Sequence, residues 1–274
     1  MKEWRLIIDK TPLPGALNMA VDEFLFRSLR DEPRTFLRFY QWAKPTASLG
    51  YSQAVEKVLD LDYCRRNGID VVRRITGGKL VLHHREITYS VVSSDTGVFS
   101  STVAESYRLI SNALLCGLEK MGLQAKLAGP PPASYGRGNM PCFSYPARDE
   151  IEIDGRKIVG SAQKRVGRRF LQHGSIPLET NEQILKRISR ADGANSEIGI
   201  ASLSEALGRP VDFEWAVDRL REGIAAYFQV RLRTKVFAPE EVAAILELQK
   251  IRYENEAWTL GKGNRPNIDF FAPE

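Results

Sequence analysis

Residues 73–89 read RRITGGKLVLHHREITY, and this stretch organises the rest of the chain. Two arginines end a short apolar run, a pair of glycines follows, and polar residues then alternate with β-branched and aromatic ones. The pattern predicts a strand, a tight glycine turn and a second strand. Gly77 and Gly78 can adopt positive φ angles and let a ligand approach the backbone closely. Arg73 and Arg74 offer planar donors for a carboxylate or a phosphate, although an ordinary hairpin with solvated arginines would give the same spacing.

The composition is typical of a globular protein that works in water. The chain has 274 residues, of which 43% are hydrophobic and 27% charged, enough for a large buried core. No apolar run approaches the roughly 20 residues of a membrane span, and the first residues do not form a secretory signal. We therefore expect a cytoplasmic protein. The net charge of +5 favours acidic partners by long-range attraction but does not require them.

The cysteines predict neither a disulfide framework nor a zinc site, because Cys64, Cys116 and Cys142 are odd in number and form no Cys-x-x-Cys spacing. Cys64 and Cys116 fall inside helical patterns, where a cysteine usually acts as a small buried hydrophobic residue. Cys142 follows a segment rich in proline and glycine, which predicts a loop. Neither a Walker loop nor a dinucleotide fingerprint occurs, and we expect no metal and no cofactor.

The order of the patterns predicts one α+β domain. A turn at Asp154-Gly155 indicates a hairpin, because this dipeptide suits a type I′ turn. The predicted strands cover residues 4–9, 35–42, 47–50, 69–72, 87–92, 150–153, 156–165 and 170–178. The predicted helices cover residues 16–29, 56–67, 101–121, 182–189, 203–207, 213–228 and 239–253. We assign residues 1–250 to a single catalytic domain and residues 251–274 to a C-terminal extension without an accessory domain.

Five stretches together resemble the superfamily of the lipoate and biotin protein ligases and the octanoyltransferases. They occur in the expected order between Gly15 and Leu178, and their combination is specific although each alone is weak. The stretches are Gly15-x2-Asn18-Met19-Ala20-Val21-Asp22-Glu23, Pro45-Thr46-Ala47-Ser48-Leu49-Gly50-x2-Gln53, Arg73-Arg74-x-Thr76-Gly77-Gly78-x4-His83-x2-Glu86-x2-Tyr89, Lys157-x2-Gly160-Ser161-Ala162-Gln163 and Leu171-Gln172-His173-Gly174-Ser175-Ile176. The resemblance implies a mixed β-sheet flanked by helices, the fold of the biotin/lipoate protein ligase catalytic domain.

Within this superfamily the chain is most similar to the octanoyl-[acyl carrier protein]:protein N-octanoyltransferases of the LipM type, which use a cysteine. Cys142 lies fifteen residues before Lys157 in a Pro-Cys-Phe context that resembles the acyl-thioester cysteine of that family. The expected lack of an accessory carboxyl-terminal domain separates the chain from the usual bacterial ATP-dependent lipoate ligases. The chain departs from the family at His84, where Asp is common, and at Lys79, where a smaller or different residue is common. Both departures concern the rim of the acyl pocket and leave the implied reaction class unchanged.

The resemblance implies a two-step acyl transfer in lipoate biosynthesis. An octanoyl group would pass from octanoyl-acyl carrier protein to Cys142 as a thioester, and then to a lysine of a lipoyl domain such as glycine cleavage H protein. No ATP is needed because the donor thioester is already activated, and we expect a monomer that binds neither nucleic acid nor membrane. The implied catalytic residues are Cys142 and Lys157. The implied substrate-binding residues are Arg73, Arg74, Thr76, Gly77, Gly78, His83, Gly160, Ser161, Ala162, His173 and Gly174.

Lys157 has two competing explanations. As a catalytic residue, its ammonium would lower the pKa of the Cys142 thiol, which is about 8.5 in an unperturbed cysteine, and would help to position the acyl carbonyl. As a structural residue, it would form a cross-strand ion pair, because a two-residue Asp154-Gly155 turn places Glu152 opposite Lys157. The resemblance favours the catalytic role.

Three other functions are compatible with the same residues. An ATP-dependent lipoate or octanoate ligase would use the two motif arginines and Lys157 to hold an acyl-adenylate phosphate, and Cys142 would be incidental. An octanoyl amidotransferase would move the group between two lipoyl proteins. A protein without activity would use its basic residues for binding alone. We expect the basic run of Arg165, Arg168 and Arg169 to dock an acidic carrier protein or lipoyl domain.

Overall fold

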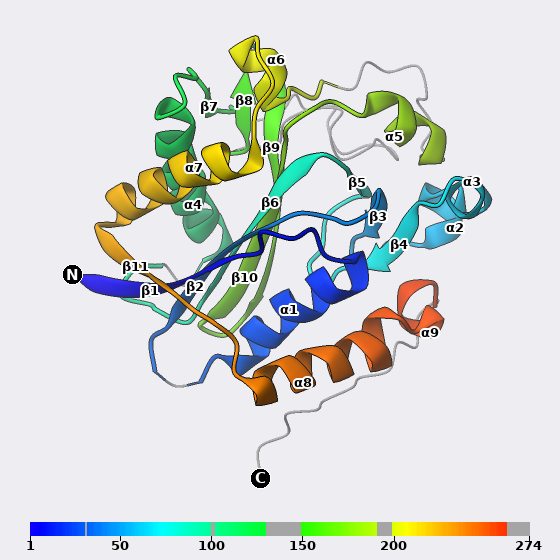
Figure 1. Ribbon diagram of the computed structural model, residues 1–274, viewed down its shortest axis with the longest axis horizontal. Coiled ribbons are helices and arrows are strands. Elements are labelled where there is room, and N and C mark those ends of the chain that lie inside the picture. Colours follow the sequence, from blue (N-terminus) through cyan, green and yellow to red (C-terminus); the bar gives the residue numbers. More distant parts are fainter. Residues whose placement is uncertain (31, 100–101, 130–148, 191–198, 262–274) are drawn as a thin grey trace.

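The computed structural model describes residues 1–30, 32–99, 102–129, 149–190 and 199–261. Within these ranges the chain forms an eight-stranded sheet, a smaller three-stranded sheet and helices that flank the larger sheet (Figure 1). The arrangement confirms the predicted α+β class with a mixed sheet flanked by helices. None of the helices in these ranges has the length and hydrophobicity that a membrane-spanning segment requires.

The larger sheet mixes parallel and antiparallel pairs. Its strands are β1 (Lys2–Ile8), β2 (Thr35–Tyr40), β6 (Glu86–Ser93), β7 (Lys126–Leu127), β8 (Ile151–Ile153), β9 (Arg156–Val166), β10 (Arg169–Pro177) and β11 (Val230–Thr234). They are ordered β11-β1-β2-β6-β10-β9-β8-β7. The central strand β6 pairs antiparallel with β2 and β10, whereas β1 pairs parallel with β2 and β11. Every residue of β6 is buried, so this strand forms the middle of the fold.

Two groups of helices cover the larger sheet. They are α1 (Gly15–Ser28) with α8 (Pro239–Leu248), and α4 (Val103–Glu119) with α7 (Phe213–Phe228). The helices α2 (Val55–Val58), α3 (Leu61–Arg66) and α5 (Glu182–Ile188) form a separate core with the smaller sheet. The remaining helices are α6 (Leu203–Leu207), a π-helical turn η1 (Gln249–Tyr253) and α9 (Glu256–Thr259). Leu37 and Phe39 of β2 share a hydrophobic core with α4 and α7. Phe36 and Tyr40 share the other core with α1 and α8. Successive side chains of a strand point to opposite faces, so β2 contributes to both cores.

The smaller sheet corrects one expectation about the glycine turn. It consists of β4 (Asp70–Arg73), β3 (Thr46–Leu49) and β5 (Val81–His83), with β3 in the middle. β4 runs parallel to β3 and β5 runs antiparallel to it. The glycine turn therefore connects two strands that do not pair with each other. An ordinary hairpin, which the spacing also allowed, is wrong because an earlier strand lies between them.

Two further elements differ from the sequence-based expectation. The single helix predicted over residues 56–67 is two helices, α2 and α3. Leu59 between them is buried and bridges Ser189, and the Asp60 side chain accepts a hydrogen bond from the Tyr63 amide at 2.9 Å as the N-cap of α3. Strand β11 was not predicted, because five residues give a weak local pattern and the pairing partner, β1, lies at the other end of the chain.

The last described helices pack on α1. Arg252 and Tyr253 of η1 donate hydrogen bonds to the buried Glu23 carboxylate at 2.7 and 2.5 Å. Trp258 of α9 is buried in the same core. The domain boundary predicted at residue 250 falls inside η1, and the contacts to α1 continue beyond it. The irregular tail predicted at the end of the chain lies almost entirely in residues 262–274, outside the described ranges.

Candidate active site

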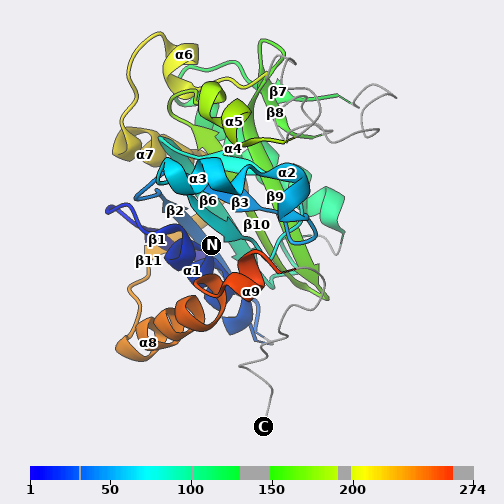
Figure 2. The same cartoon turned by 90° about the vertical axis from the view of Figure 1, so that its right-hand side faces the viewer.

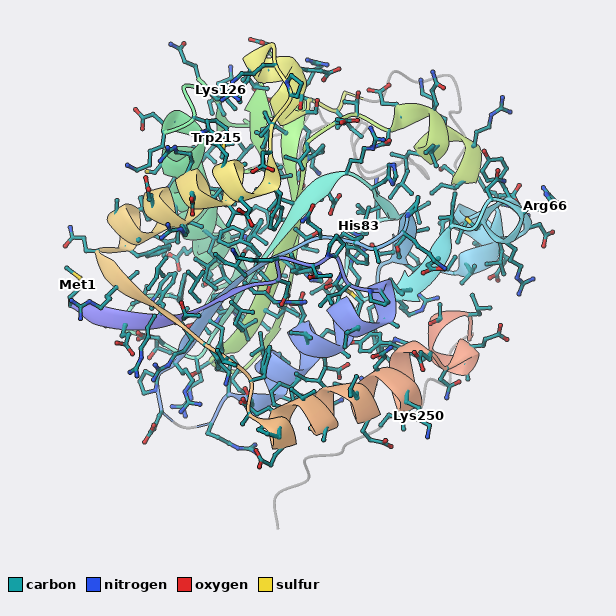
Figure 3. The ribbon with its side chains drawn as sticks, viewed as in Figure 1. Met1, Arg66, His83, Lys126, Trp215 and Lys250 are labelled. Carbon is teal, nitrogen blue, oxygen red and sulfur yellow. The ribbon has the colours of Figure 1, made fainter. Side chains whose placement is uncertain are left out.

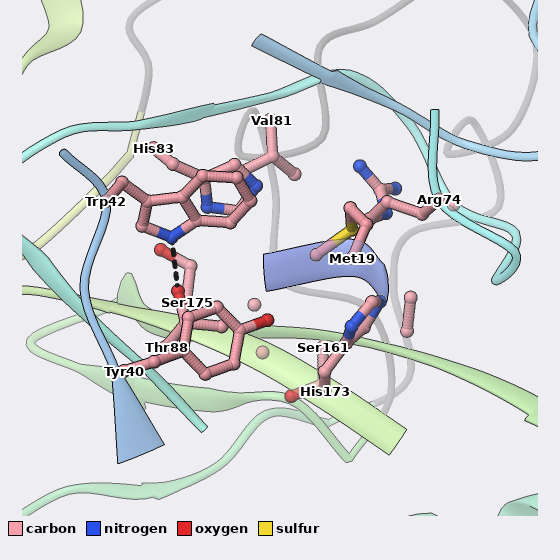
Figure 4. Close-up of a pocket in the computed structure, with 14 residues that line it drawn as sticks. Met19, Tyr40, Trp42, Arg74, Val81, His83, Thr88, Ser161, His173 and Ser175 are labelled. Atoms are coloured by element: carbon pink, nitrogen blue, oxygen red, sulfur yellow. Dashed lines mark hydrogen bonds between the residues drawn. The ribbon is translucent and has the colours of Figure 1, made fainter. Parts of the chain in front are cut away.

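A cavity, called the central cavity below, opens between α1, the larger sheet and the smaller sheet. Figure 2 shows the smaller sheet in front of β6, β9 and β10, and Figure 4 shows the cavity itself. Its void space is about 440 Å³, which includes open solvent at the mouth. Its lining consists of Met19, Tyr40, Trp42, Arg74, Gly78, Val81, His83, Thr88, Gly160, Ser161, Ala162, His173, Gly174 and Ser175.

Most of the predicted substrate-binding residues meet in this lining, although they come from segments up to a hundred residues apart. The predicted residues in the lining are Arg74, Gly78, His83, Gly160, Ser161, Ala162, His173 and Gly174. Arg73, Thr76 and Gly77 are not part of it. The roles of all of them in substrate binding stay predictions.

Arg74 ties the glycine turn to β3. Its guanidinium donates to the Ser48 carbonyl at 2.7 Å and to the Ser48 hydroxyl at 2.5 Å. It also donates to the carbonyls of Gly77 and Lys79, each at 3.0 Å. The side chain is buried, so solvation of this arginine, the simpler explanation of the motif, is wrong.

Arg73 braces a different part of the chain and is also buried. It donates to the carbonyls of Gly50 and Gln53 at 2.9 and 2.7 Å and to the Thr259 carbonyl at 3.1 Å. The guanidinium thus joins the end of β4 to the loop after β3 and to α9. These contacts hold the loop after β3 and α9 against the end of β4, next to the cavity.

The backbone requires glycine at Gly78, because of its φ angle, and at Gly50, because of space. Gly78 has a φ angle of 91°, in the region that favours glycine. Its carbonyl lies against Gly50, where an added Cβ would be 2.0 Å from the Gly78 oxygen. Any side chain at Gly50 would therefore push the turn away from β3 and change the mouth of the cavity.

One side of the cavity holds a neutral histidine. The Nδ1 of His173 is 3.0 Å from Asp22, and its Nε2 is 2.8 Å from the Thr76 hydroxyl. Burial lowers the pKa of His173 more than the neighbouring Asp22 raises it, so the pKa lies below its ordinary value. The neutral ring donates from Nδ1 to the carboxylate and accepts from Thr76 at Nε2. Its basic nitrogen is therefore engaged, and it is not placed to act as a general base.

Asp22 is the centre of a buried network that the sequence did not single out. Its carboxylate accepts hydrogen bonds from Arg38 at 2.9 Å, from Tyr40 at 3.0 Å and from Ser90 at 3.0 Å, besides His173. Burial alone would raise the pKa of Asp22, but the His173 hydrogen bond and the Arg38 charge outweigh it and hold the pKa below its ordinary value. The sequence feature that could have indicated this network is the position of Asp22, a carboxylate in the middle of the apolar run of α1.

The other side of the cavity is closed by stacked rings. Trp42 stacks on His83 with a centroid distance of 4.0 Å, and its indole N–H donates to the Thr88 hydroxyl at 2.7 Å. The Nδ1 of His83 is 2.7 Å from Glu86, and its Nε2 is 2.6 Å from the Ser48 hydroxyl. Figure 3 shows His83 in the interior of the molecule. Sequence patterns placed Trp42 in a strand and gave Glu86 no role.

Ser161 lines the cavity beside a buried tyrosine. The hydroxyls of Tyr89 and Ser161 are 2.7 Å apart, and Gln172 donates to the Tyr89 oxygen at 3.0 Å. Burial raises the pKa of Tyr89 to about 12, so the phenol is neutral and can donate to Ser161. The Ser161 proton can then point into the cavity. Gly174 makes room for this pair, because an added Cβ would lie 2.6 Å from the Tyr89 ring.

Lys157 lies three residues before Gly160 on β9, outside the cavity lining, and its side chain is 1% exposed. Its Nζ is 2.6 Å from the Glu150 carboxylate, whereas the predicted pairing was with Glu152. The predicted hairpin register, Glu152 opposite Lys157, is confirmed. The partner differs because the pairing between β8 and β9 is irregular just before Glu152, whose carboxylate lies 3.5 Å from Lys126 instead.

The second predicted catalytic residue, Cys142, lies outside the described residues. The structure describes the chain up to residue 129 and again from residue 149, immediately before Glu150. Of the other two cysteines, Cys64 is fully buried. Burial raises the pKa of the Cys64 thiol to about 11, which suits the predicted structural role. Among the described residues, no cluster of three or more histidine, cysteine or carboxylate side chains could hold a metal.

Comparison with known proteins identifies the family. The chain matches the lipoyl protein ligase A/B catalytic domain over residues 14–225. The octanoyltransferase LipM of Geobacillus kaustophilus is 36% identical, with 93% of this chain and 97% of that protein covered. The octanoyltransferase LipM of Symbiobacterium thermophilum is 37% identical, with 94% of this chain and 98% of that protein covered.

Two solved structures share the fold. Lipoate-protein ligase A bound with ATP superimposes with a TM-score of 0.82 at 25% identity, covering 94% of this chain and 99% of that one. The bipartite lipoate protein ligase of Thermoplasma acidophilum superimposes with a TM-score of 0.83 at 23% identity, covering 98% and 100%. Because the domain match covers most of the chain and the relatives match along nearly its whole length, this chain belongs to the lipoyl protein ligase A/B catalytic domain family, as its motifs implied.

Proposed function

We propose that this protein transfers an octanoyl group from octanoyl-acyl carrier protein, through a thioester on Cys142, to a lysine of a lipoyl domain such as glycine cleavage H protein. The observation that carries the proposal is the similarity to octanoyltransferases along nearly the whole chain. The central cavity supports it, because its walls include apolar side chains that suit a fatty acyl chain, namely Met19, Tyr40, Trp42 and Val81. The protein acts as a cytoplasmic monomer without a cofactor.

The reaction has two displacement steps. The Cys142 thiolate attacks the carbonyl carbon of the donor thioester, a new C–S bond forms, and the carrier protein leaves as a thiolate that takes a proton from water. The neutral lysine amine of the lipoyl domain then attacks the same carbon. A C–N bond forms, Cys142 leaves as the thiolate, and the surplus amine proton passes to water. The first step exchanges one thioester for another, and the second is downhill because it forms an amide.

Three side chains serve these steps. Lys157 stabilises the Cys142 thiolate, and lowering that pKa by about 1.5 units requires about 2 kcal/mol of preferential stabilisation. Ser161 donates its proton to the acyl carbonyl oxygen, on which negative charge develops. His173 is neutral and lines the cavity without adding a charge, which suits an uncharged acyl chain.

A Cys142→Ser variant tests the proposal. The wild-type protein is incubated with octanoyl carrier protein without ATP and weighed by mass spectrometry, and the lipoyl domain is then added. We expect an octanoyl adduct on the wild type and a loss of transfer of at least about a thousandfold in the variant, because an alkoxide is a poor leaving group and a serine hydroxyl is a weak nucleophile. Cys64→Ser serves as a matched control without an effect on transfer. A variant that transfers as fast as the wild type contradicts the mechanism.

The ATP-dependent ligase is the alternative that one observation favours, namely the likeness to the ATP-bound lipoate-protein ligase A. In that reaction Arg73, Arg74 and Lys157 would bind an acyl-adenylate phosphate. The donors of the two arginines instead contact carbonyls of the chain itself, as described above, which favours the transferase. Activity with octanoate and MgATP but not with octanoyl carrier protein would establish the ligase. A lipoyl protein that serves as the only donor would establish the amidotransferase.

The basic run predicted to dock an acidic partner is partly used inside the protein. Arg165 lies over the Phe170 ring at 4.9 Å and donates to the Ser106 hydroxyl at 2.5 Å. Arg169 lies over the Phe26 ring at 5.8 Å. Docking of the carrier protein or the lipoyl domain on this run stays a prediction. Arg165 and Arg169 make contacts within the protein that the sequence did not indicate.

A further inference from the structure

Lys157 of β9 forms a buried ion pair with Glu150, which immediately precedes β8. Their side chains are 1% and 8% exposed, and Nζ is 2.6 Å from the Glu150 carboxylate. The backbone of Lys157 is fixed on both sides, since its N–H donates to Gly199 at 2.7 Å and its carbonyl accepts from Ala201 at 2.9 Å. The Glu150 carbonyl accepts from Ala128 at 2.7 Å. Both members of the pair are thus held by regular backbone contacts.

A buried ammonium requires an opposite charge. Burial disfavours the charged form of a lysine and lowers its pKa, whereas a carboxylate at hydrogen-bond distance favours the charged form. Glu150 provides that carboxylate. Loss of this carboxylate removes a charge that favours the ammonium, so the pKa of Lys157 is expected to fall.

The pair lies next to the central cavity. Lys157 precedes the lining residues Gly160 and Ser161 on the same strand. The negative charge of Glu150 reaches Tyr89, where it adds to the effect of burial in raising the phenol pKa. Tyr89 in turn contacts Ser161 in the lining. A change of charge at Glu150 is therefore expected to affect the Tyr89–Ser161 hydrogen bond in the cavity wall.

We infer that Glu150 is a positioning residue for acyl transfer, which holds Lys157 in place and keeps it charged. The inference rests on the proposed function, because it takes Lys157 to be the cation that serves the transfer. The role of Glu150 is indirect, since it acts through Lys157.

Glu152, two residues further along the chain on β8, provides a matched control. Its carboxylate is 15% exposed and lies 3.5 Å from Lys126, which is 73% exposed and lies at the periphery in Figure 3. Exposed pairs of this kind contribute little to stability. Glu150→Gln and Glu152→Gln therefore make the same chemical change in a buried and in a more exposed ion pair.

The experiment measures kcat/KM for octanoyl transfer against pH. We expect Glu150→Gln to shift the alkaline limb to lower pH by about one unit or more, because Lys157 loses its proton more easily, and to reduce the rate by about tenfold or more at pH values above the wild-type limb. Glu150→Asp keeps the charge and is expected to keep the limb near its wild-type position. Glu152→Gln is expected to leave the profile unchanged. In the part of the chain that the structure describes, titratable groups on the surrounding elements include Glu152 of β8, Tyr89 of β6, and Arg156 of β9 with its partner Glu205 of α6.

A second measurement separates this role from a loss of structure. In a Lys157→Met background, Glu150→Gln is expected to change the residual rate no further, because Glu150 acts through the lysine. Thermal unfolding of each variant shows whether it is folded. An alkaline limb that stays in place in folded Glu150→Gln, or an equal further loss in the Lys157→Met background, overturns the inference. Failure of the wild type to transfer octanoyl overturns the proposed function instead.

Discussion

Two buried histidine–carboxylate pairs lie on different sides of the central cavity, and Figure 4 shows their histidines, His83 and His173. His173 lies 3.0 Å from Asp22, and His83 lies 2.7 Å from Glu86. Both carboxylates are almost completely buried. The pairs are chemically alike, yet the groups that hold each carboxylate differ.

Asp22 is held by a cation and Glu86 by hydroxyl groups. Asp22 contacts the Arg38 guanidinium at 2.9 Å, whereas Glu86 accepts hydrogen bonds from Thr88 and Ser175. The comparison teaches that one side of the cavity is an ionic brace between α1, β2 and β10. On the other side, next to the ring stack, hydroxyl groups surround one carboxylate. The same pair of residue types can therefore serve stability in one place and cavity shape in another.

The largest expected difference between the sides appears when each carboxylate loses its charge. Asp22→Asn leaves the buried Arg38 with Asp9 as its remaining carboxylate, and we expect a loss of about 3 kcal/mol or more in the free energy of unfolding. Glu86→Gln keeps most of its contacts to hydroxyls, and we expect a loss of about 1–2 kcal/mol. Urea denaturation measures both values. Equal losses would show that the two carboxylates are held in the same way.

A smaller difference is expected when each histidine loses the hydroxyl at its Nε2. Ser48→Ala removes a hydroxyl that contacts both His83 and Arg74, so two buried groups lose a partner, and we expect a cost of about 2 kcal/mol. Thr76→Val removes the hydroxyl next to His173, with an expected cost of about 1 kcal/mol. A larger cost for Thr76→Val, measured in the same urea titration, would contradict the network described here.

The smallest expected effect is the pH dependence caused by His173. Its folded pKa lies below the unfolded value of about 6.5, so the unfolded chain binds more protons between the two values. Its contribution to stability is present above about pH 6.5 and is lost as the pH falls through the folded pKa. His173→Gln should therefore flatten the decrease in unfolding free energy below pH 6.5, by up to about 1.4 kcal/mol per pH unit. His84→Gln, at a half-buried histidine, should flatten it less, and an unchanged slope in His173→Gln would refute the assignment of a neutral ring.

The sequence anticipated much of the site because its motifs lie in regular elements. Gly160, Ser161 and Ala162 fall on a predicted strand, and His173 and Gly174 fall on the next, so antiparallel pairing brings them together. The residues that it missed act through contacts across the fold. Asp22 lies in one of the motifs and interrupts an apolar run, but the local sequence around Asp22, Trp42 or Glu150 does not show its partner, which is at least seven positions away in each case.

The amino-acid sequence by itself determined the α+β class, the family, the Asp154-Gly155 hairpin register and the need for glycine after the two arginines. These features depend on local periodicity, turn chemistry and short motifs, which can be read from neighbouring residues without knowledge of the tertiary contacts. The tertiary structure alone decided that β3 lies between β4 and β5, and that Lys157 pairs with Glu150 rather than with Glu152. The physical reason is that strand order and ion-pair choice depend on burial and on small irregularities of pairing, which arise only when distant segments pack together.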